Sequence, residues 1–317
     1  MGYHSSNFKS RWGYGFVVLA ALLWASGGTA SKFLFNNGLS PFQLVQLRVT
    51  ICGVVLFAVL GIRRPSLLRI SRGDILYFAI LGIFGMAAVQ FFYLFAISKI
   101  NVAAAILLEY LAPVFIALHT LVFTREKLNG YVIAAIAGAV AGCYLVVGAY
   151  NLNLLTLNAA GILGGIGAAV SFAWFSVHGE YGMRRYDPWT VFFYGSLFAL
   201  VVWNILQPPF QSFRQSYSLE AWFWIGYVGV MGTILPFGLY YQGINLIRST
   251  RASITATLEP IIAGLISYLF LNEVMSPLQM MGGVLVIGSI ILLQVKHEVD
   301  NKAPGVLRSR KTGNDAI

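Results

Sequence analysis

The chain has 317 residues, of which 58% are hydrophobic and only 10% are charged, and its formal net charge is +10. Soluble globular proteins carry about 25% charged residues, so this composition excludes an ordinary soluble fold and favours a protein solvated by lipid. The positive charge does not indicate a nucleic-acid partner, because most lysines and arginines lie in short segments between apolar runs.

Apolar segments of about 20 residues follow one another along the chain, and each is long enough to cross a bilayer as a helix. The predicted spans are 13–35, 41–61, 74–98, 102–123, 129–150, 159–180, 188–206, 219–246, 249–271 and 277–295. The first span follows Lys9 and Arg11, as in a signal peptide, but it is longer than the apolar region of such a peptide. The sequence therefore predicts an all-α membrane protein with ten transmembrane helices, preceded by a short N-terminal segment, 1–12.

The connecting segments differ in charge between the two sides of the membrane. Of the 21 Lys and Arg residues, 17 fall in the termini and loops of one side, and only Lys99 and Arg214 fall on the other. Because positively charged loops stay in the cytoplasm, this pattern places both termini there, together with a basic tail, 296–317. The predicted location is the inner cell membrane. The tail after Asp300 is polar and is expected to be disordered.

The chain contains an internal repeat. A shift of 147 residues pairs Pro41 with Pro188 and Pro113 with Pro260 without gaps. The same shift pairs further Gly, Tyr and Glu residues, namely Gly82 with Gly229, Gly85 with Gly232, Tyr93 with Tyr240, and Glu126 with Glu273. Each half holds five predicted spans, so the second half enters the membrane from the opposite side. Such inverted repeats are a common plan of secondary transporters, with the substrate site near the membrane midplane.

Four segments of the chain resemble segments of a known family. They are LLWASGGTASKFLF at 22–35, LSPFQLVQLR at 39–48, LLEYLAPVFIALHTLVFTREKL at 107–128 and ATLEPIIAGLISYLFLNEVMS at 256–276. The most specific feature is the spacing from proline to glutamate, which is the same from Pro113 to Glu126 as from Pro260 to Glu273. The chain resembles the EamA-like family of the drug/metabolite transporter superfamily. The resemblance implies two five-helix repeats, 13–150 and 159–295, around a central cavity, and typically export of amino acids and other small metabolites. It also implies a helix-end structural role for Glu126 and Glu273.

Two carboxylates lie inside predicted spans, where an ionised group costs about 2.5–3.5 kcal/mol on insertion scales. Glu109 lies four residues before Pro113, and Glu259 lies directly before Pro260. Each proline leaves a helix carbonyl without its usual donor, so carboxylate and carbonyl together favour a cation or a proton. Glu109 and Glu259 are therefore predicted to be substrate-binding residues, and Glu109 is predicted to contact substrate or proton, since its burial would suit proton coupling. Alternatively, each carboxylate braces a neighbouring helix by hydrogen bonds.

Aromatic and histidine side chains complete the predicted substrate site, since ring faces can hold an amine cation, although plain packing is the alternative. They are Trp24, Tyr93, Tyr110, Trp174, His178, Tyr240 and Tyr241. Arg48, inside the second span, is expected to form a structural ion pair, and Pro113 and Pro260 are expected to shape their helices. Repeated glycines, including Gly142 and Gly165, are expected to let neighbouring helices pack closely.

These features predict a secondary transporter, in particular an exporter of small polar metabolites such as amino acids or amines, which works by alternating access. An importer of quaternary ammonium compounds is the alternative. A membrane-embedded enzyme is less favoured, because the sequence shows no catalytic pair and no metal-binding motif. The expected partners are a small-molecule substrate, possible protons and the lipid bilayer, and no cofactor, metal or nucleic acid is predicted. Substrate identity, direction and oligomeric state stay open.

Overall fold

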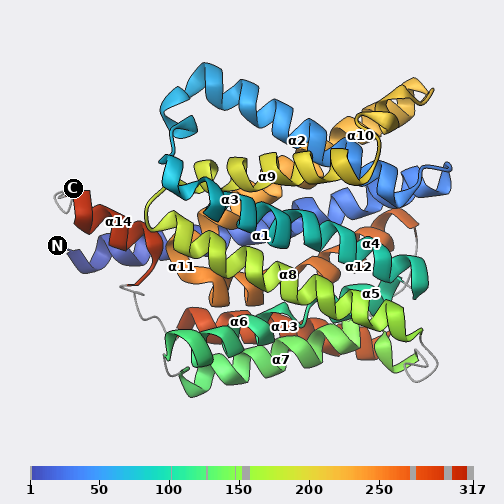
Figure 1. Ribbon diagram of the computed structural model, residues 1–317. Helices are drawn as coiled ribbons and strands as arrows, with labels where there is room; N and C mark the ends of the chain where they lie inside the picture. Colours follow the sequence, from blue (N-terminus) through green and yellow to red (C-terminus); the bar gives the residue numbers. More distant parts are fainter. Residues whose placement is uncertain are drawn as a thin grey trace.

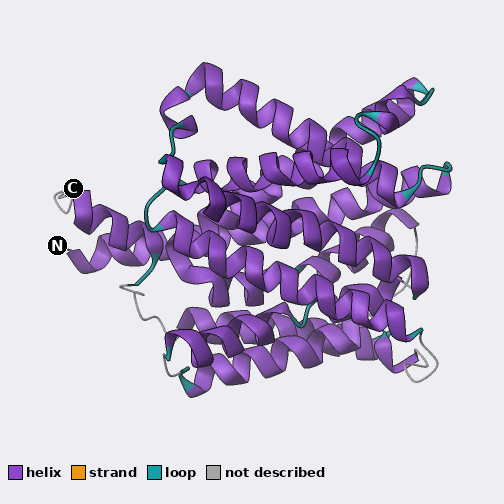
Figure 2. Cartoon of the chain, viewed as in Figure 1, coloured by secondary structure: helices purple, strands orange, loops and turns teal. Residues whose placement is uncertain are grey.

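The computed structural model of the protein describes residues 2–100, 102–125, 128–146, 148–151, 158–271, 276–295 and 302–312. All regular elements within these ranges are helices, and most run along a common direction as a layered bundle (Figures 1 and 2). The predicted all-α fold is therefore confirmed.

The first half of the chain contributes seven α-helices and several short helical turns. The α-helices are α1 (Gly2–Asn36), α2 (Pro41–Arg63), α3 (Ile75–Ile80), α4 (Ala88–Lys99), α5 (Val102–Glu109), α6 (Ala112–His119) and α7 (Gly130–Val146). The short turns are η1 (Pro65–Leu68), η2 (Arg72–Asp74), η3 (Leu81–Ala87), η4 (Thr120–Thr124) and η5 (Ala149–Asn151). The π-helical turn η3 joins α3 to α4, so these three elements form one continuous helix.

The second half repeats this pattern with long helices and short turns. Its α-helices are α8 (Ala159–Met183), α9 (Pro188–Leu206), α10 (Leu219–Gly229), α11 (Leu235–Ala256), α12 (Glu259–Leu271) and α13 (Pro277–Val295), and α14 (Pro304–Thr312) follows. The short turns are η7 (Gln211–Arg214) and η8 (Val230–Ile234). The π-helical turn η8 joins α10 to α11, as η3 joins α3 to α4 in the first half.

Seven helical stretches of the described residues are long and apolar enough to cross a membrane. They are Arg11–Asn36, Pro41–Arg63, Arg72–Ala96, Ala105–Thr124, Ala159–Met183, Pro188–Leu206 and Leu219–Ala256. Two shorter apolar helices, Gly130–Val146 and Pro277–Leu293, coincide with the predicted spans 129–150 and 277–295. The protein is therefore a multi-pass membrane protein.

The stretch Leu219–Ala256 covers a region that the sequence divides into two spans, 219–246 and 249–271. The helix is broken within it, because Arg248 has a φ of 66° and a ψ of 164°, which no helical residue adopts. A residue other than glycine in this region costs about 1–3 kcal/mol and persists only where its surroundings hold it. The predicted boundary between the two spans thus falls on a real break in the helix.

The register of 147 residues is repeated in local structure. Ser40 and Asp187 occupy equivalent positions and are the N-cap residues of α2 and α9. α5 ends at Glu109 and α6 begins at Ala112, while α11 ends at Ala256 and α12 begins at Glu259. Both breaks fall at the same place in the repeat, which fits a two-repeat architecture.

Glycines bring neighbouring helices into close contact. A Cβ atom on Gly142 of α7 would lie 2.6 Å from Val286 Cγ2 and 2.7 Å from the carbonyl oxygen of Gly282, both on α13. A Cβ atom on Gly165 of α8 would lie 2.5 Å from Leu108 Cδ1 on α5. These approaches confirm the packing role predicted for the repeated glycines.

The C-terminal tail departs from the sequence prediction. Residues 302–312, which were expected to be disordered, contain the helix α14, packed against α8 and α11. The Arg308 guanidinium donates hydrogen bonds from Nη1 to the carbonyl oxygens of Met183 at 2.8 Å and Tyr186 at 2.6 Å. The end of a helix leaves carbonyl groups without donors, and Arg308 supplies them at the end of α8. Composition alone could not predict this contact.

Candidate functional site

The two helix breaks bring predicted site residues together. Glu109 is the last residue of α5, Tyr110 follows it in the break, and Glu259 is the first residue of α12. The hydroxyl group of Tyr110 donates a hydrogen bond to Glu259 Oε2 at 2.7 Å. A side chain at the break of one half therefore binds the carboxylate at the equivalent break of the other half.

Arg48 of α2 and Tyr93 of α4 join this cluster. Arg48 interacts electrostatically with both Glu109 and Glu259. The two carboxylates interact with each other, and Tyr93 interacts with both of them. All five side chains are half-buried. Charge interactions between partly buried groups are stronger than those at a fully solvated surface, so the charges of this cluster depend on one another.

The guanidinium group of Arg48 holds no carboxylate. Its Nε atom is buried without a hydrogen-bond partner, and none of the ion pairs of the described residues involves Arg48. An arginine is charged at all physiological pH values and carries five N–H donors. The structural ion pair that we predicted for Arg48 is thus not found in the described part of the chain. The charge of Arg48 interacts with the carboxylates of Glu109 and Glu259, but its Nε–H group has no acceptor among the described residues.

Three predicted residues lie on α1 and α8. Trp24 packs on Phe237 with ring centroids 5.0 Å apart, and His178 stacks on Trp174 at 3.5 Å, as their four-residue spacing predicts. Trp24 Nε1, Trp174 Nε1 and His178 Nδ1 are buried without hydrogen-bond partners. No hydrogen bond within the described ranges joins these three side chains to the carboxylate cluster.

Tyr240 and Tyr241 occupy the packed core. Both side chains are 0% exposed. The hydroxyl group of Tyr240 lies 2.9 Å from Ser176 Oγ, and that of Tyr241 donates to the carbonyl oxygen of Phe175 at 3.0 Å. Both tyrosines are therefore fully enclosed by protein in this structure, unlike Tyr93, which is half-buried. Their satisfied hydroxyl groups explain how the core accommodates them.

The remaining predicted structural residues divide into two groups. Pro113 and Pro260 lie in the first turns of α6 and α12, where a missing N–H group costs the helix no internal hydrogen bond. Each proline is therefore the second residue of the second piece of a broken helix. Glu126 and Glu273 lie outside the described residues.

Sequence reasoning overlooked Glu180, at the end of the predicted sixth span. Its side chain is buried, and its carboxylate accepts hydrogen bonds from Arg248 Nε at 3.0 Å, Ser249 N at 2.8 Å and Ser249 Oγ at 2.6 Å. Arg184, four residues later, forms an ion pair with Glu180 at 3.8 Å. The i,i+4 spacing to Arg184 was the only local signal. These contacts hold the break at Arg248 in place.

The loop between α8 and α9 is tied to the start of α3. Arg185 Nη1 lies 2.9 Å from Asp74 Oδ1, and the hydroxyl group of Tyr186 donates to the second oxygen of that carboxylate. Burial and this hydrogen bond raise the pKa of Tyr186, so its hydroxyl group stays protonated and available as a donor. This loop is therefore a braced element.

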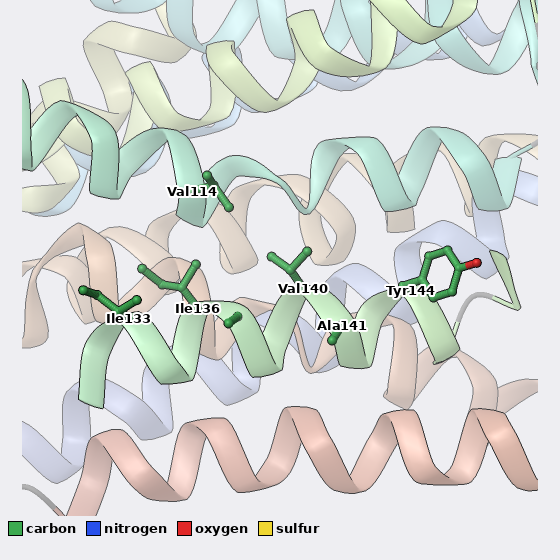
Figure 3. A pocket seen from close by; sticks show the side chains of 7 residues that line it. Val114, Ile133, Ile136, Val140, Ala141 and Tyr144 are labelled. Carbon is green, nitrogen blue, oxygen red and sulfur yellow. The ribbon is translucent and has the colours of Figure 1, made fainter. Parts of the chain in front are cut away.

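A pocket of about 570 Å³ lies between α6 and α7 (Figure 3). It is lined by Val114, Ile133, Ile136, Ala137, Val140, Ala141 and Tyr144. None of these residues is charged, and none belongs to the predicted site. The pocket offers apolar surface and is unsuited to a polar metabolite.

The chain matches known proteins over most of its length. It is 28% identical over 287 residues to the uncharacterized inner membrane transporter YicL of Salmonella typhimurium, covering 88% of this chain and 94% of that protein. It is 27% identical over 286 residues to a probable terminal-alkyne amino-acid exporter of Streptantibioticus cattleyicolor, covering 87% of this chain and 91% of that protein. A solved crystal structure superposes with a TM-score of 0.74 at 21% identity, covering 89% of this chain and 96% of that one, and therefore shares its fold.

The sequence also matches a family model twice, once in each half. The model describes the EamA-like transporter family and matches residues 11–148 and 159–295. Both matches coincide with the predicted repeats, and together they span most of the 317 residues. The chain belongs to the EamA-like transporter family of the drug/metabolite transporter superfamily.

Proposed function

We propose that the protein is a secondary transporter that exports small polar metabolites, with amino acids or amines as the favoured cargo. The observation that carries this proposal is the contact of Tyr110 with Glu259, in a cluster that also holds Glu109 and Arg48. Charged groups within membrane helices are costly and mark substrate or ion pathways. Broken helices near the midplane are the places where transporters of this kind bind their cargo.

The charges of the cluster fit cargo that carries an amine. Glu109 and Glu259 supply two carboxylates that can bind an ammonium group, while the guanidinium of Arg48 can bind a carboxylate. An amino acid offers both groups in one molecule. The name of the relative from Streptantibioticus cattleyicolor, a probable amino-acid exporter, supports this class of cargo. A carboxylate that exchanges cargo for a proton would link transport to the proton gradient.

Alternating access requires two halves that move about a shared site. We propose ten membrane spans in two inverted five-helix repeats, 13–150 and 159–295, with both termini and the tail, 296–317, in the cytoplasm. The break at Arg248 supports dividing the stretch Leu219–Ala256 into parts of two spans. Reporter fusions after Arg72 and Arg185 should report cytoplasm, and fusions after Asn37 should report the outside. A reversed result at either cytoplasmic site would refute this topology.

Import of quaternary ammonium compounds is less favoured than amino-acid or amine export. Such cargo is usually bound by a cage of aromatic faces. Tyr240 and Tyr241, which we predicted as substrate-binding residues, are 0% exposed, whereas Tyr93 and Tyr110 are half-buried. No catalytic machinery is proposed, in keeping with relatives that are named as transporters.

A thermal-shift screen of the purified protein tests the cargo class. Amino acids, polyamines and quaternary amines are added one at a time, because a ligand that binds the folded state raises its stability, by about 2.7 kcal/mol at 100 times Kd. We expect an amino acid or amine to raise the melting temperature, and Glu109→Gln to abolish the shift. The exposed Glu220, in the first turn of α10, supplies the matched control Glu220→Gln. Stabilisation by quaternary amines alone would contradict the proposal.

A further inference from the structure

The carboxylate of Glu180 connects α8 to the turn at which one span of α11 ends and the next begins. It accepts one hydrogen bond from the side chain of Arg248 and two from Ser249. The backbone at Arg248 has a positive φ that a helix does not tolerate, so this turn depends on its neighbours. Glu180 is therefore the group that fixes the start of the broken helix leading to Glu259.

The repeat places no carboxylate at the position of the first half that is equivalent to Glu180. The register of 147 residues places Phe33 opposite Glu180, and Val102 opposite Ser249. Phe33 is 37% exposed and cannot accept a hydrogen bond, whereas Glu180 is 4% exposed. Equivalent positions of an inverted repeat lie toward opposite faces of the membrane. Glu180, Arg248 and Ser249 thus form a hydrogen-bonded cluster, called the latch below. The position equivalent to Glu180 in the first half holds the apolar ring of Phe33.

The burial of the two broken helices differs in the same sense. Residues 251–257, between the latch and Glu259, are all buried. The first half has residues 104–110 at the equivalent positions; among those whose side chains the structure describes, Ala105 is buried and residues 106–110 are half-buried. Ser253 is 2% exposed, while Ile106, at the equivalent position, is half-buried. The helix segment beside the latch is therefore buried more deeply than its counterpart in the first half.

The helix α14 packs beside the latch. Arg308 binds the carbonyl oxygens of Met183 and Tyr186, just beyond Glu180 on α8. Gly305 approaches Asn245 of α11 so closely that a Cβ atom would lie 3.0 Å from its side-chain amide nitrogen. α14 therefore contacts both helices that the latch joins.

We propose that Glu180 is a gate-positioning residue, which holds closed the end of the substrate path beside Arg248 and so makes the protein rest open toward the opposite end. This inference rests on the proposed transport function, because a gate has meaning only for a transporter. In the transport cycle, the hydrogen bonds that Glu180 accepts from Arg248 and Ser249 break when the end of the path beside Arg248 opens. They form again when it closes, whereas the opposite end opens without breaking such a latch.

Accessibility of two equivalent positions tests the gate. The variants Ser253→Cys and Ile106→Cys each place one reporter thiol on a broken helix, and their reaction with a water-soluble maleimide is timed in nanodiscs. The native Cys52 and Cys143 are 0% exposed, and the unmodified protein gives their background rate. We expect the Ile106→Cys reporter to react at least about tenfold faster than the Ser253→Cys reporter. Adding Glu180→Ala should raise the rate of the Ser253→Cys reporter about tenfold and lower that of the Ile106→Cys reporter.

Opposite changes at the two reporters distinguish a gate from a merely structural contact. Equal increases at both reporters would show general loosening and would overturn the inference, as would unchanged rates at both. Arg248→Gly is a second variant that tolerates the positive φ and keeps both bonds of Glu180 to Ser249, so it tests the latch even if Glu180→Ala fails to fold. It should change the two rates in the same directions as Glu180→Ala, and Glu220→Gln should change neither. Because labelling needs no cargo, a failed cargo screen leaves this test valid.

Discussion

The broken helix of the first half, α5 with α6, and that of the second half, α11 with α12, share a break at the same register but differ in what they place there. Tyr110 follows the end of α5 and binds Glu259 across the repeat. The equivalent residue, Thr257, donates instead to the carbonyl oxygen of Ile254 in its own helix. The hydroxyl group of Tyr110 thus binds a carboxylate of the other half, while that of Thr257 binds a backbone carbonyl oxygen of its own helix.

The carboxylates differ in the same way. Glu109 ends α5 and is equivalent to Ala256, whereas Glu259 begins α12 and is equivalent to Ala112. Each half therefore supplies one acidic group, from opposite sides of its break. The two halves therefore share the shape of the backbone at the break, but their carboxylates stand at positions that are not equivalent in the repeat. Each carboxylate can therefore be compared with a counterpart that lacks its chemical group.

The largest effect is expected from removing either carboxylate charge. Glu109→Gln and Glu259→Gln keep the size of the side chain and should each weaken cargo binding about 100-fold, because a hydrogen bond between charged groups of site and cargo is worth about 1.5–3 kcal/mol. Calorimetric titration of the cargo found by the thermal-shift screen measures this loss. If either variant binds cargo as the unmodified protein does, that carboxylate is a helix brace and not part of the site.

The next effect concerns Arg48 and separates amino acids from amines. Arg48→Gln removes the cation that can bind a carboxylate, so an amino acid should lose about tenfold or more in affinity, since charge-assisted hydrogen bonds are worth about 1.5–3 kcal/mol. The amine formed by decarboxylating the same amino acid should bind unchanged or more tightly. Competition titrations of the matched pair measure both affinities. Arg214→Gln, in an exposed turn, is the control. Parallel losses for both ligands would instead assign Arg48 a structural role.

A smaller effect is expected at Tyr110. Tyr110→Phe removes the 2.7 Å hydrogen bond to Glu259 and should lower stability by about 1.5–3 kcal/mol, the range for a hydrogen bond to a charged group. Melting temperatures in detergent report this change. Tyr144→Phe, in the apolar pocket between α6 and α7, should have little effect. Combining Tyr110→Phe with Glu259→Gln should give less than the sum of the two losses, and strict additivity would argue against direct coupling.

The smallest effect is expected at Thr257, the counterpart of Tyr110. Thr257→Val removes one hydrogen bond to Ile254 within the helix and should cost about 0.5–1.5 kcal/mol. Cargo affinity should not change, because Thr257 is 0% exposed and makes no hydrogen bond to either carboxylate among the described residues. Melting temperature and cargo titration are measured on the same sample. A loss of cargo affinity comparable to that of Tyr110→Phe would remove the distinction between the two breaks.

Several features of the fold followed from local sequence signals. Pro113 and Pro260 marked the two breaks, because proline begins a helix more readily than it continues one. The spacing from Trp174 to His178 predicted their stacking, and Gly142 marked a close helix contact. Arg248 fell between two predicted spans, where the helix does break. Each of these predictions depends on residues close together in the chain.

Other features escaped the sequence because they depend on residues far apart. Tyr93 and Tyr240 are equivalent in the repeat, yet Tyr93 reaches the carboxylate cluster and Tyr240 lies in the core with Ser176. Glu180 was overlooked in the sequence, because Arg248 and Ser249, which donate hydrogen bonds to its carboxylate, lie far along the chain. The polar composition of the tail predicted disorder, but residues 304–312 form a helix, and Arg308 donates a hydrogen bond to a carbonyl oxygen at the end of α8.

The sequence by itself determined that this is a helical membrane protein whose two halves repeat. The length of the apolar segments predicts membrane helices, and the register of 147 residues, which pairs prolines, glycines and glutamates, predicts the repeat. Only the tertiary structure decided which members of each equivalent pair meet. The two repeats share the path of the backbone, but a hydrogen bond such as that from Tyr110 to Glu259 depends on side chains from opposite halves. Their distance is set by how the helices pack, and packing depends on the whole molecule at once.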